Sequence, residues 1–396
     1  MQKLQRCVLS LTPTRLAIDM ADTTWRFEDF MVLRDQANDM KPAHIDPRRP
    51  LWIFGAGNFG LSLATAMQQQ GFVVGGFVET SPRSDRVAGL PVVNWQQLSQ
   101  DAPTAQVALG ILNRDTPYDA LLGIAAKAGF ANLLMPWDLY EQFSGALGWR
   151  FWLGARASLL GAMERIGRVA EGLADDESRK ILYRICAFRL GLDMQYASFS
   201  SGEAQYINEL TVPALTGREI TFVDCGAYDG DSYEALLARP EVSCGQAFLL
   251  EPDPGNFVRL VQQVSAKGRN AVCLPLAAAE RHSLLSFNAG QGEASAISDQ
   301  GDGISITALA LDQMLPAAPV DLIKLDVEGA EAAVLRGAAR IIGRNRPVLA
   351  VSLYHNPQDL WELPELLSVL CSNYRLHIRQ HASNTFDSVL YAVPNP

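Results

Sequence analysis

The chain has 396 residues, of which 48% are hydrophobic and 19% are charged, so its composition indicates two or three globular domains and excludes a disordered protein. Its formal net charge is −10 and its basic residues form no run, so we expect neither nucleic acid nor an anionic membrane as a partner. The six cysteines form no C-x-x-C pair and no apolar run is long enough to cross a membrane, which favours a cytoplasmic protein with free thiols.

The first part of the chain divides into an N-terminal extension, residues 1–49, and an α/β domain, residues 50–145. The extension has a mixed pattern that predicts no element, and prolines mark its end. In the domain, short apolar segments alternate with helical ones, which is typical of a parallel sheet. Strands are predicted at 51–54, 72–78, 91–93 and 107–111, with a helix at 61–70.

A glycine motif, Gly55-x-Gly57-x-x-Gly60, stands between the first strand and the helix of this domain. Such glycines allow a tight turn and let a pyrophosphate approach a helix N-terminus. Glu79, at the end of the next strand, can accept hydrogen bonds from ribose hydroxyls. The motif therefore predicts a second nucleotide site, in addition to the main site described below. It also leaves open an NAD(P)-dependent oxidoreductase, a nucleotide-sugar-binding protein, or a turn that binds nothing.

Residues 146–203 differ in character, because apolar side chains recur there at the spacing of a helix. The repeating positions are Leu159, Leu160, Met163, Ile166, Val169 and Leu173. We expect a helical connector packed between two domains.

Strand and helix alternate again over residues 204–396, which predicts a second α/β domain. Its strands are predicted at 220–224, 247–251, 272–276, 284–287, 322–326 and 348–353, and its helices at 231–238, 254–266, 330–342 and 359–372. The expected fold is therefore two Rossmann-like doubly wound sheets joined by the helical connector.

The chemistry is expected at a second glycine loop, which runs from Asp224 through Gly226 to Gly230. Its glycines leave room for a ligand close to the backbone. The acidic residues around the loop would repel a pyrophosphate, but they suit a ligand that carries an ammonium and a sulfonium and no phosphate. S-adenosylmethionine is such a ligand. Glu251, at the end of the next strand, can accept hydrogen bonds from both hydroxyls of its ribose.

These residues resemble the FkbM family of methyltransferases. The matching segments are Phe222–Asp231, Leu250–Asp253, Leu322–Glu331 and Val351–Asp359. The resemblance covers residues 204–393 and is most specific over Lys324–Glu331. It implies an S-adenosylmethionine-dependent O-methyltransferase of the Rossmann-like type, which acts on a hydroxyl of a sugar or of another small secondary-metabolite acceptor.

The resemblance also implies roles for single residues. Those expected to line the methionine end of the cofactor are Asp224, Gly226, Tyr228 and Gly230. Glu251 would hold the ribose, and Ala277 would lie near the adenine. Ala278-Ala-Glu280 stands where the family usually has an acid or serine turn after that alanine, so the group that binds the adenine amine stays open.

Three residues near strand ends are the candidates for catalysis: Asp326, Glu328 and His355. In a parallel sheet they would face the crevice where such sheets bind ligands. In one arrangement His355 or Asp326 removes the proton of the acceptor hydroxyl. In the other, the carboxylates and the imidazole hold a divalent cation that lowers the pKa of that hydroxyl. The first is preferred, so no metal is predicted. The histidines expected at the surface are His282, His377 and His381.

Overall fold

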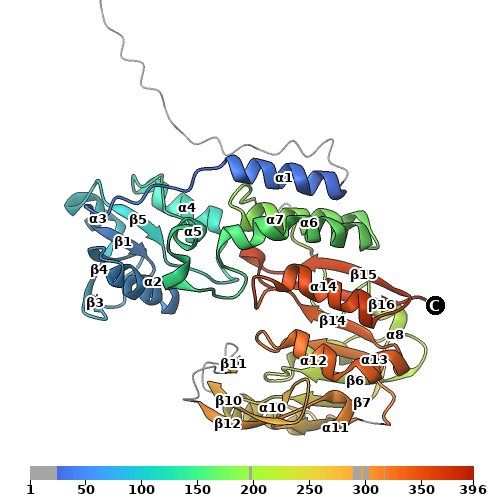
Figure 1. The fold of residues 1–396 in the computed structure, drawn as a ribbon. Coiled ribbons are helices and arrows are strands. Elements are labelled where there is room, and N and C mark those ends of the chain that lie inside the picture. The colour runs from blue at the N-terminus through green and yellow to red at the C-terminus, as the bar shows by residue number, and fades with distance from the viewer. Residues whose placement is uncertain (1–24, 196–198, 289–295, 298–302, 316) are drawn as a thin grey trace, which may run out of the picture.

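The computed structural model describes residues 25–195, 199–288, 296–297, 303–315 and 317–396 (Figure 1). Residues 1–24, which belong to the expected extension, lie outside the described residues. Within these ranges the chain forms three sheets and a layer of helices. None of the described helices has the length and hydrophobicity needed to span a membrane.

The N-terminal unit, residues 51–147, contains a five-stranded sheet with the order β3-β4-β2-β1-β5. Its strands are β1 (Leu51–Phe54), β2 (Val74–Glu79), β3 (Arg86–Val87), β4 (Leu90–Asn94) and β5 (Gln106–Leu109). Its helices are α2 (Asn58–Gln69), α3 (Trp95–Asp101), α4 (Tyr118–Lys127) and α5 (Pro136–Leu147). All strand pairs are parallel except β3 with β4, so the four strands predicted here are present in a parallel arrangement.

The helical connector is present as α6 (Arg156–Gly172) and α7 (Asp176–Arg189). The helix α1 (Phe27–Asp39), which the sequence pattern did not predict, packs along α6 (Figure 1).

The connector also buries a histidine that was expected at the surface. Asp175 caps α7 by accepting a hydrogen bond from the Ser178 backbone N–H at 2.6 Å, and its second oxygen lies 2.5 Å from His377 Nδ1. His377 is therefore buried against the connector, and the surface position expected for it is wrong. His381 is half-buried, whereas His282 is exposed.

The C-terminal part of the chain forms a seven-stranded sheet with the order β15-β16-β14-β13-β6-β7-β8. Its strands are β6 (Glu219–Cys225), β7 (Ser243–Leu250), β8 (Val272–Leu274), β13 (Leu322–Leu325), β14 (Val348–Ser352), β15 (Tyr374–Gln380) and β16 (Ser388–Pro394). Its helices are α8 (Val212–Leu215), α9 (Asp231–Leu237), α10 (Pro254–Ala266), α11 (Leu311–Met314), α12 (Glu331–Gly337), α13 (Ala339–Asn345) and α14 (Asp359–Leu370). The last two strands, β15 and β16, were not predicted, and β16 runs antiparallel to both of its neighbours, β14 and β15.

Two further features of this part differ from the prediction. The strand expected at 284–287 belongs to a separate small sheet with the order β11-β10-β12-β9. Its strands are β9 (Ala277–Ala278), β10 (Ser283–Asn288), β11 (Ala296–Ile297) and β12 (Ile304–Leu309). The helix expected at 330–342 is split into α12 and α13. At this break Gly337 packs so closely that a Cβ there would lie 2.1 Å from the Ala279 carbonyl oxygen.

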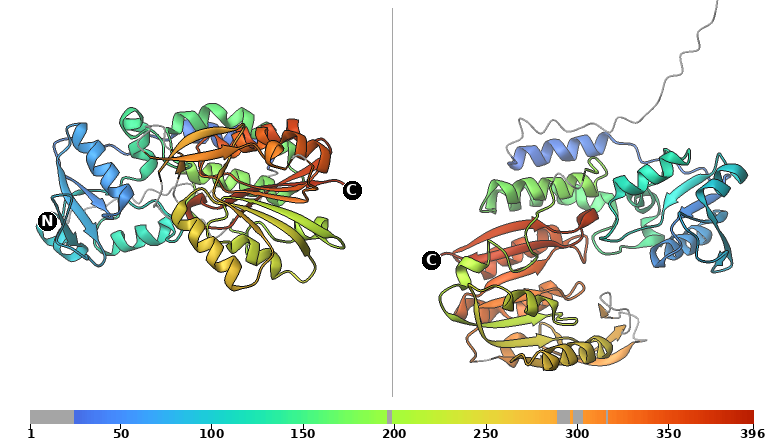
Figure 2. Two further views of the ribbon diagram at one scale, coloured as in Figure 1. Left: turned by 90° about the horizontal axis from the view of Figure 1, so that it is seen from below. Right: turned by 180° about the vertical axis from the view of Figure 1, so that it is seen from behind.

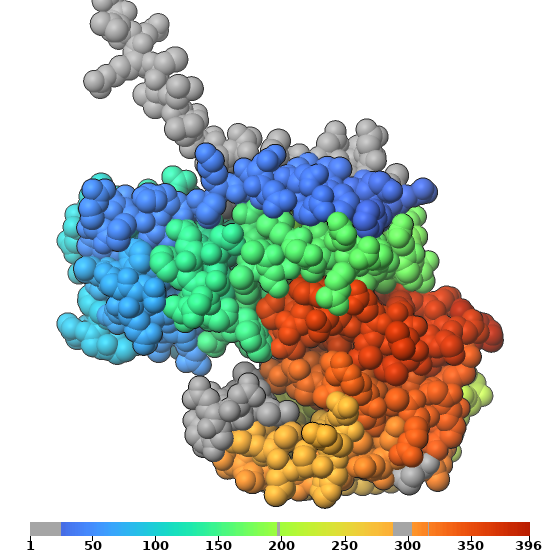
Figure 3. Space-filling model, viewed as in Figure 1, coloured from blue at the N-terminus to red at the C-terminus, as the bar shows by residue number. Residues whose placement is uncertain are grey.

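The core is continuous across the chain. One hydrophobic cluster extends from Phe30 and Ile53 through Phe188 of the connector to Val351, on one face of the seven-stranded sheet. A second cluster, which includes Phe222, fills the other face. The space-filling view shows the green connector in contact with both the N-terminal unit and the red C-terminal elements (Figure 3), and the same order is visible from below and behind (Figure 2). The N-terminal unit therefore shares its core with the rest of the protein.

The turn between β15 and β16 joins the N-terminal unit to the large sheet. Asn384, in this turn, is buried in the left-handed backbone region with φ 57°. Its side-chain nitrogen donates to the carbonyl oxygens of Asn113 (2.9 Å) and Thr116 (2.8 Å), and its oxygen accepts from the Tyr118 N–H at 3.0 Å. The loop that follows β5 is thus pinned to the C-terminal sheet.

We expect Asn384→Asp to lower the free energy of unfolding by about 2–4 kcal/mol, because a carboxylate would face two buried carbonyl oxygens. Urea denaturation followed by tryptophan fluorescence measures this. The matched control is Asn373→Asp, at an exposed left-handed position where the side-chain oxygen only accepts a hydrogen bond. It should cost less than about 0.5 kcal/mol. Equal costs for both variants would contradict the pinning role of Asn384.

Candidate active site

A cavity of about 330 Å³ lies outside the carboxyl ends of β6 and β13. These strands are neighbours, and the chain continues from β6 to β7 on one side and from β13 to β14 on the other. The cavity therefore lies at the switch point where open α/β sheets bind ligands. Gly226 and Asp326, which directly follow the two strands, both line it.

The glycine loop approaches β13 very closely. Gly226 has φ +84°, and a Cβ on it would lie 1.9 Å from the backbone oxygen of Asp326, so this position requires glycine. Tyr228 is also left-handed, with φ 49°, and lines the cavity. Gly230, with φ +93°, forms the turn into α9. Of the four residues expected at the methionine end, Gly226 and Tyr228 thus line the cavity itself.

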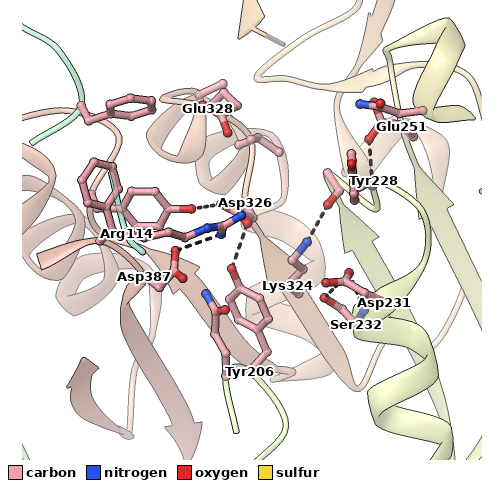
Figure 4. Close-up of a pocket in the computed structure, with 18 of the residues that line it drawn as sticks. Arg114, Tyr206, Tyr228, Asp231, Ser232, Glu251, Lys324, Asp326, Glu328 and Asp387 are labelled. Atoms are coloured by element: carbon pink, nitrogen blue, oxygen red, sulfur yellow. Dashed lines mark hydrogen bonds and ion pairs between the residues drawn. The ribbon is translucent and has the colours of Figure 1, made fainter. Parts of the chain in front are cut away.

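Glu251 lies at the end of β7 with its carboxylate at the cavity (Figure 4). Its Oε2 accepts a hydrogen bond from the Tyr228 N–H at 2.9 Å, and its Oε1 accepts from the Asp253 N–H at 2.8 Å. Burial raises the pKa of Glu251, although these hydrogen bonds oppose the shift. Ala277, expected near the adenine, lines the same cavity.

Asp224 does not line the cavity, because its side chain is fully buried beneath Lys324. Lys324 Nζ lies 3.0 Å from Asp224 Oδ1, donates to the Gly226 carbonyl at 2.6 Å and lines the cavity. Burial raises the pKa of Asp224 to about 7, and the charge of Lys324 opposes that shift. Sequence reasoning assigned Lys324 no role. The sequence signal that could have indicated a role for Lys324 is its position inside an apolar strand, because a buried lysine requires a partner of opposite charge.

The Asp326 carboxylate accepts hydrogen bonds from three hydroxyl groups. Its Oδ2 accepts from the Tyr206 hydroxyl at 2.9 Å, and its Oδ1 accepts from the hydroxyls of Ser352 (2.9 Å) and Tyr354 (3.2 Å). Burial alone would raise the pKa of Asp326, but the charges of Lys324 and His355 and these hydrogen bonds lower it. The three hydroxyls were not predicted from the sequence.

His355 lies behind the cavity wall, with a side chain that is 1% exposed. Its Nδ1 is 2.8 Å from Glu331 Oε1, and its Nε2 is 3.3 Å from Asp326 Oδ1 and 3.6 Å from Glu328 Oε1. Burial would lower the pKa of His355, but the neighbouring carboxylates raise it well above its usual value. The three expected catalytic residues are therefore brought together. Asp326, Glu331 and His355 also offer atoms within 4.8 Å of one another, close enough to share a metal ion.

Glu328 is the other carboxylate of this group that reaches the cavity. It has a left-handed backbone with φ 53°, and Gly329 follows it with φ +99°. Burial raises the pKa of Glu328, although His355 opposes the shift. The carboxylate therefore combines access to the cavity with an increased proton affinity.

The first glycine motif lies apart from this cavity. Gly55 has φ +105°, and a Cβ on Gly60 would lie 2.0 Å from the Gly55 carbonyl oxygen, so both glycines are needed for packing. Only Gly57 has open space where a Cβ would project. Glu79 Oε1 accepts a hydrogen bond from the Ala56 N–H at 3.2 Å, as Glu251 does from the other glycine loop.

Comparison with known proteins finds a match to a methyltransferase domain in the C-terminal part. Residues 224–381 match the methyltransferase FkbM domain. The chain is similar to the crystal structure of methyltransferase FkbM from Methylobacillus flagellatus KT, with 21% identity and a TM-score of 0.70, over 92% of this chain and 98% of that one. The α/β fold with parallel sheets is therefore shared along nearly the whole chain. No curated protein sequence matches.

Two other solved structures align with about half of the chain. An rRNA methylase from Streptococcus thermophilus is 12% identical, with a TM-score of 0.31, over 47% of this chain and 93% of that one. A precorrin-6y C5,15-methyltransferase from Geobacter metallireducens GS-15 is 12% identical, with a TM-score of 0.31, over 50% of this chain and 93% of that one.

We expect Lys324→Met to destabilise the fold by about 3–5 kcal/mol, because it leaves the buried Asp224 carboxylate without its cation. The double variant Lys324→Met/Asp224→Asn should recover most of this loss, as measured by urea denaturation. The control Lys267→Met breaks a partly exposed pair with Glu234 and should cost less than about 1 kcal/mol. Additive losses at Lys324 and Asp224 would show that the two residues do not form a coupled pair.

Proposed function

We propose that this protein is an S-adenosylmethionine-dependent O-methyltransferase that acts on a hydroxyl of a carbohydrate or another small molecule. One observation carries the proposal. The cavity has a glycine loop and Glu251 at one end, and it has Asp326 and Glu328 at the other (Figure 4). The first end suits a nucleoside-bearing cofactor and the second suits an acceptor whose proton must be removed.

The charges of the cavity support a cofactor without phosphate. Among the described residues that line it, the basic ones are Arg114 and Lys324, and each lies beside a carboxylate. Gly226 and Tyr228 would hold the methionine portion, Glu251 the ribose hydroxyls, and Ala277 would lie at the adenine. When bound, the cofactor would supply a methyl group activated by a sulfonium.

Glu328 is the group that we propose as general base. A base works best when its pKa lies near the working pH, and burial moves the pKa of Glu328 in that direction. Asp326 has a lowered pKa and accepts three hydroxyl hydrogen bonds, so it orients the acceptor rather than taking its proton. The sequence analysis considered His355 as a general base. We propose instead that it is a positioning residue. Neighbouring carboxylates raise its pKa, and its Nε2 lies 3.3 Å from Asp326 Oδ1 and 3.6 Å from Glu328 Oε1, so it would position these two carboxylates through charge.

A nucleotide site in the N-terminal unit remains a further proposal. The parallel order β4-β2-β1-β5 supports a Rossmann-like assignment, and the open space at Gly57 beside Glu79 supports a ligand there. An NAD(P)-dependent oxidoreductase is the alternative function on this basis. It is less favoured because the carboxylates suited to catalysis lie at the other cavity.

Glu251→Ala should weaken the binding of S-adenosylhomocysteine by at least about tenfold, because it removes charge-assisted hydrogen bonds to the ribose. Isothermal titration calorimetry on the folded variant measures this. Glu241→Ala, which removes an exposed carboxylate, is the control and should leave the affinity unchanged. If Glu251→Ala also binds as tightly as the unaltered protein, the assignment of the cofactor end is wrong.

The rate of methyl transfer should fall as the pH is lowered through the raised pKa of Glu328, because only the deprotonated carboxylate accepts a proton. Glu328→Gln should reduce kcat by about 10²–10⁴-fold and abolish this acid limb, while the exposed Glu362→Gln should change neither. Radiolabelled methyl transfer to methyl glycosides provides the rates. Activity lost on addition of EDTA, with an unchanged pH profile in Glu328→Gln, would favour the cation arrangement instead.

A further inference from the structure

One wall of the cavity comes from the N-terminal unit. Residues 112–115, which follow β5, line the cavity together with Phe151, although the chemistry is expected at the other sheet. Residues that follow β5, β6 and β13 therefore line the same cavity. In Figure 4, Arg114 from this wall extends toward Asp326.

The wall is held rigidly in place. The Ser383 N–H donates to the Arg114 carbonyl at 3.2 Å, and Asn384 bonds the carbonyls on both sides of it, those of Asn113 and Thr116. The loop and the turn between β15 and β16 thus form one unit. The backbone that carries Arg114 is fixed relative to the C-terminal sheet.

The Arg114 side chain ends a polar chain that leads to the site of chemistry. Its Nη1 lies 3.5 Å from Asp387 Oδ1, and the Asp387 side chain is 9% exposed. The Tyr354 hydroxyl donates a hydrogen bond to Asp326 Oδ1 at 3.2 Å, and Tyr354 also interacts with Asp387 and lowers its pKa. The Arg114 side chain is 40% exposed, so among these polar side chains it is the first that a ligand entering the cavity would reach.

We propose that Arg114 and Asp387 contact the methyl acceptor and select molecules that carry neighbouring hydroxyls and no charge near the reacting one. The inference rests on the proposed function. A diol can accept a hydrogen bond from the guanidinium and donate one to the carboxylate. The rings of Phe151 and Phe386, 5.3 Å apart, provide an apolar surface beside this pair.

An anionic acceptor is disfavoured by the charges of the same wall. Asp115, Asp387, Asp326 and Glu328 all line the cavity, and Asp387 already balances the charge of Arg114. A carboxylate or phosphate on the acceptor would therefore meet more negative than positive charge. Removing the charge of Asp387 should reduce this excess of negative charge beside Arg114.

The test uses the full-length protein, radiolabelled S-adenosylmethionine and a panel of neutral methyl hexopyranosides with their uronic acid counterparts. We expect neutral glycosides to be methylated with at least about tenfold higher kcat/KM than the acids. Arg114→Gln should lower kcat/KM for the neutral glycosides by at least about tenfold, mainly through KM, and leave the affinity for S-adenosylhomocysteine unchanged. Asp387→Asn should shift the preference toward the acids by a similar factor. Arg83→Gln, an exposed arginine of the same unit, is the matched control and should behave as the unaltered protein.

Three results would overturn the inference: a preference for the acids in the unaltered protein, an Arg114→Gln variant with unchanged kcat/KM, or no methylation of any panel member by a protein that binds S-adenosylhomocysteine. In each of these cases the cofactor assignment survives. Absence of S-adenosylhomocysteine binding would instead remove the proposed function, and the inference with it. Urea denaturation of each variant separates loss of folding from loss of recognition.

Discussion

The site depends on the hydrogen bonds and charge contacts of the Asp326 carboxylate. This carboxylate lies at the end of β13, where the sheet reverses its order, and it collects hydroxyl hydrogen bonds from Tyr206, Ser352 and Tyr354. A buried carboxylate is costly unless such partners surround it. Because these partners come from β14 and from the segment before β6, satisfying this one charge fixes the relative positions of several elements. His355 and Lys324 add the positive charges that keep it ionised.

The second constraint is the closeness of the two central strands. Gly226 allows its loop to lie against the Asp326 backbone, and Lys324, between them, contacts the Asp224 carboxylate and the Gly226 carbonyl at once. The end of the cavity that we propose for the cofactor and the end that we propose for catalysis are therefore linked through the contacts of Lys324. A change at Lys324 would disturb both ends, although Lys324 performs no chemistry in our proposal.

In our proposal the N-terminal unit contributes to the main site through its contacts, apart from any ligand at its glycine motif. Its core is continuous with that of the connector and of the large sheet, and its loop after β5 forms a wall of the cavity. We propose that this unit shapes the acceptor end. The hydrogen bonds of Asn384, which hold that loop against the C-terminal sheet, agree with such a role. This role requires no ligand at Gly57.

The apolar strands and the glycine loops could be predicted from the sequence because their signals are local. Leu322–Leu325 and Val348–Ser352 are short apolar runs, and Gly226 stands directly after such a run. The strand β15 could not be predicted in this way. Its alternating Arg375, His377 and Arg379 resemble an exposed segment, and the burial of the last two depends on Asp175, far away in the chain.

The candidate site shows the same division. Asp326, Glu328, His355 and Glu251 stand at strand ends, so the topology of a parallel sheet was enough to bring them to one edge. Tyr206 lies in a segment without a regular element, and its position is set by a hydrogen bond from its N–H to the Tyr391 hydroxyl at 3.2 Å. Such a pairing leaves no pattern in the sequence. The raised pKa of His355 likewise follows from carboxylates that only the fold brings together.

The most direct test of this account is a crystal structure of the protein with S-adenosylhomocysteine and NADH both supplied. The account predicts S-adenosylhomocysteine in the cavity outside β6 and β13, with its ribose hydroxyls on the Glu251 carboxylate and its sulfur on the side of Asp326. S-adenosylhomocysteine bound at Gly55–Gly60, or bound in the cavity with its ribose away from Glu251, would contradict it. So would NADH in that cavity in place of S-adenosylhomocysteine.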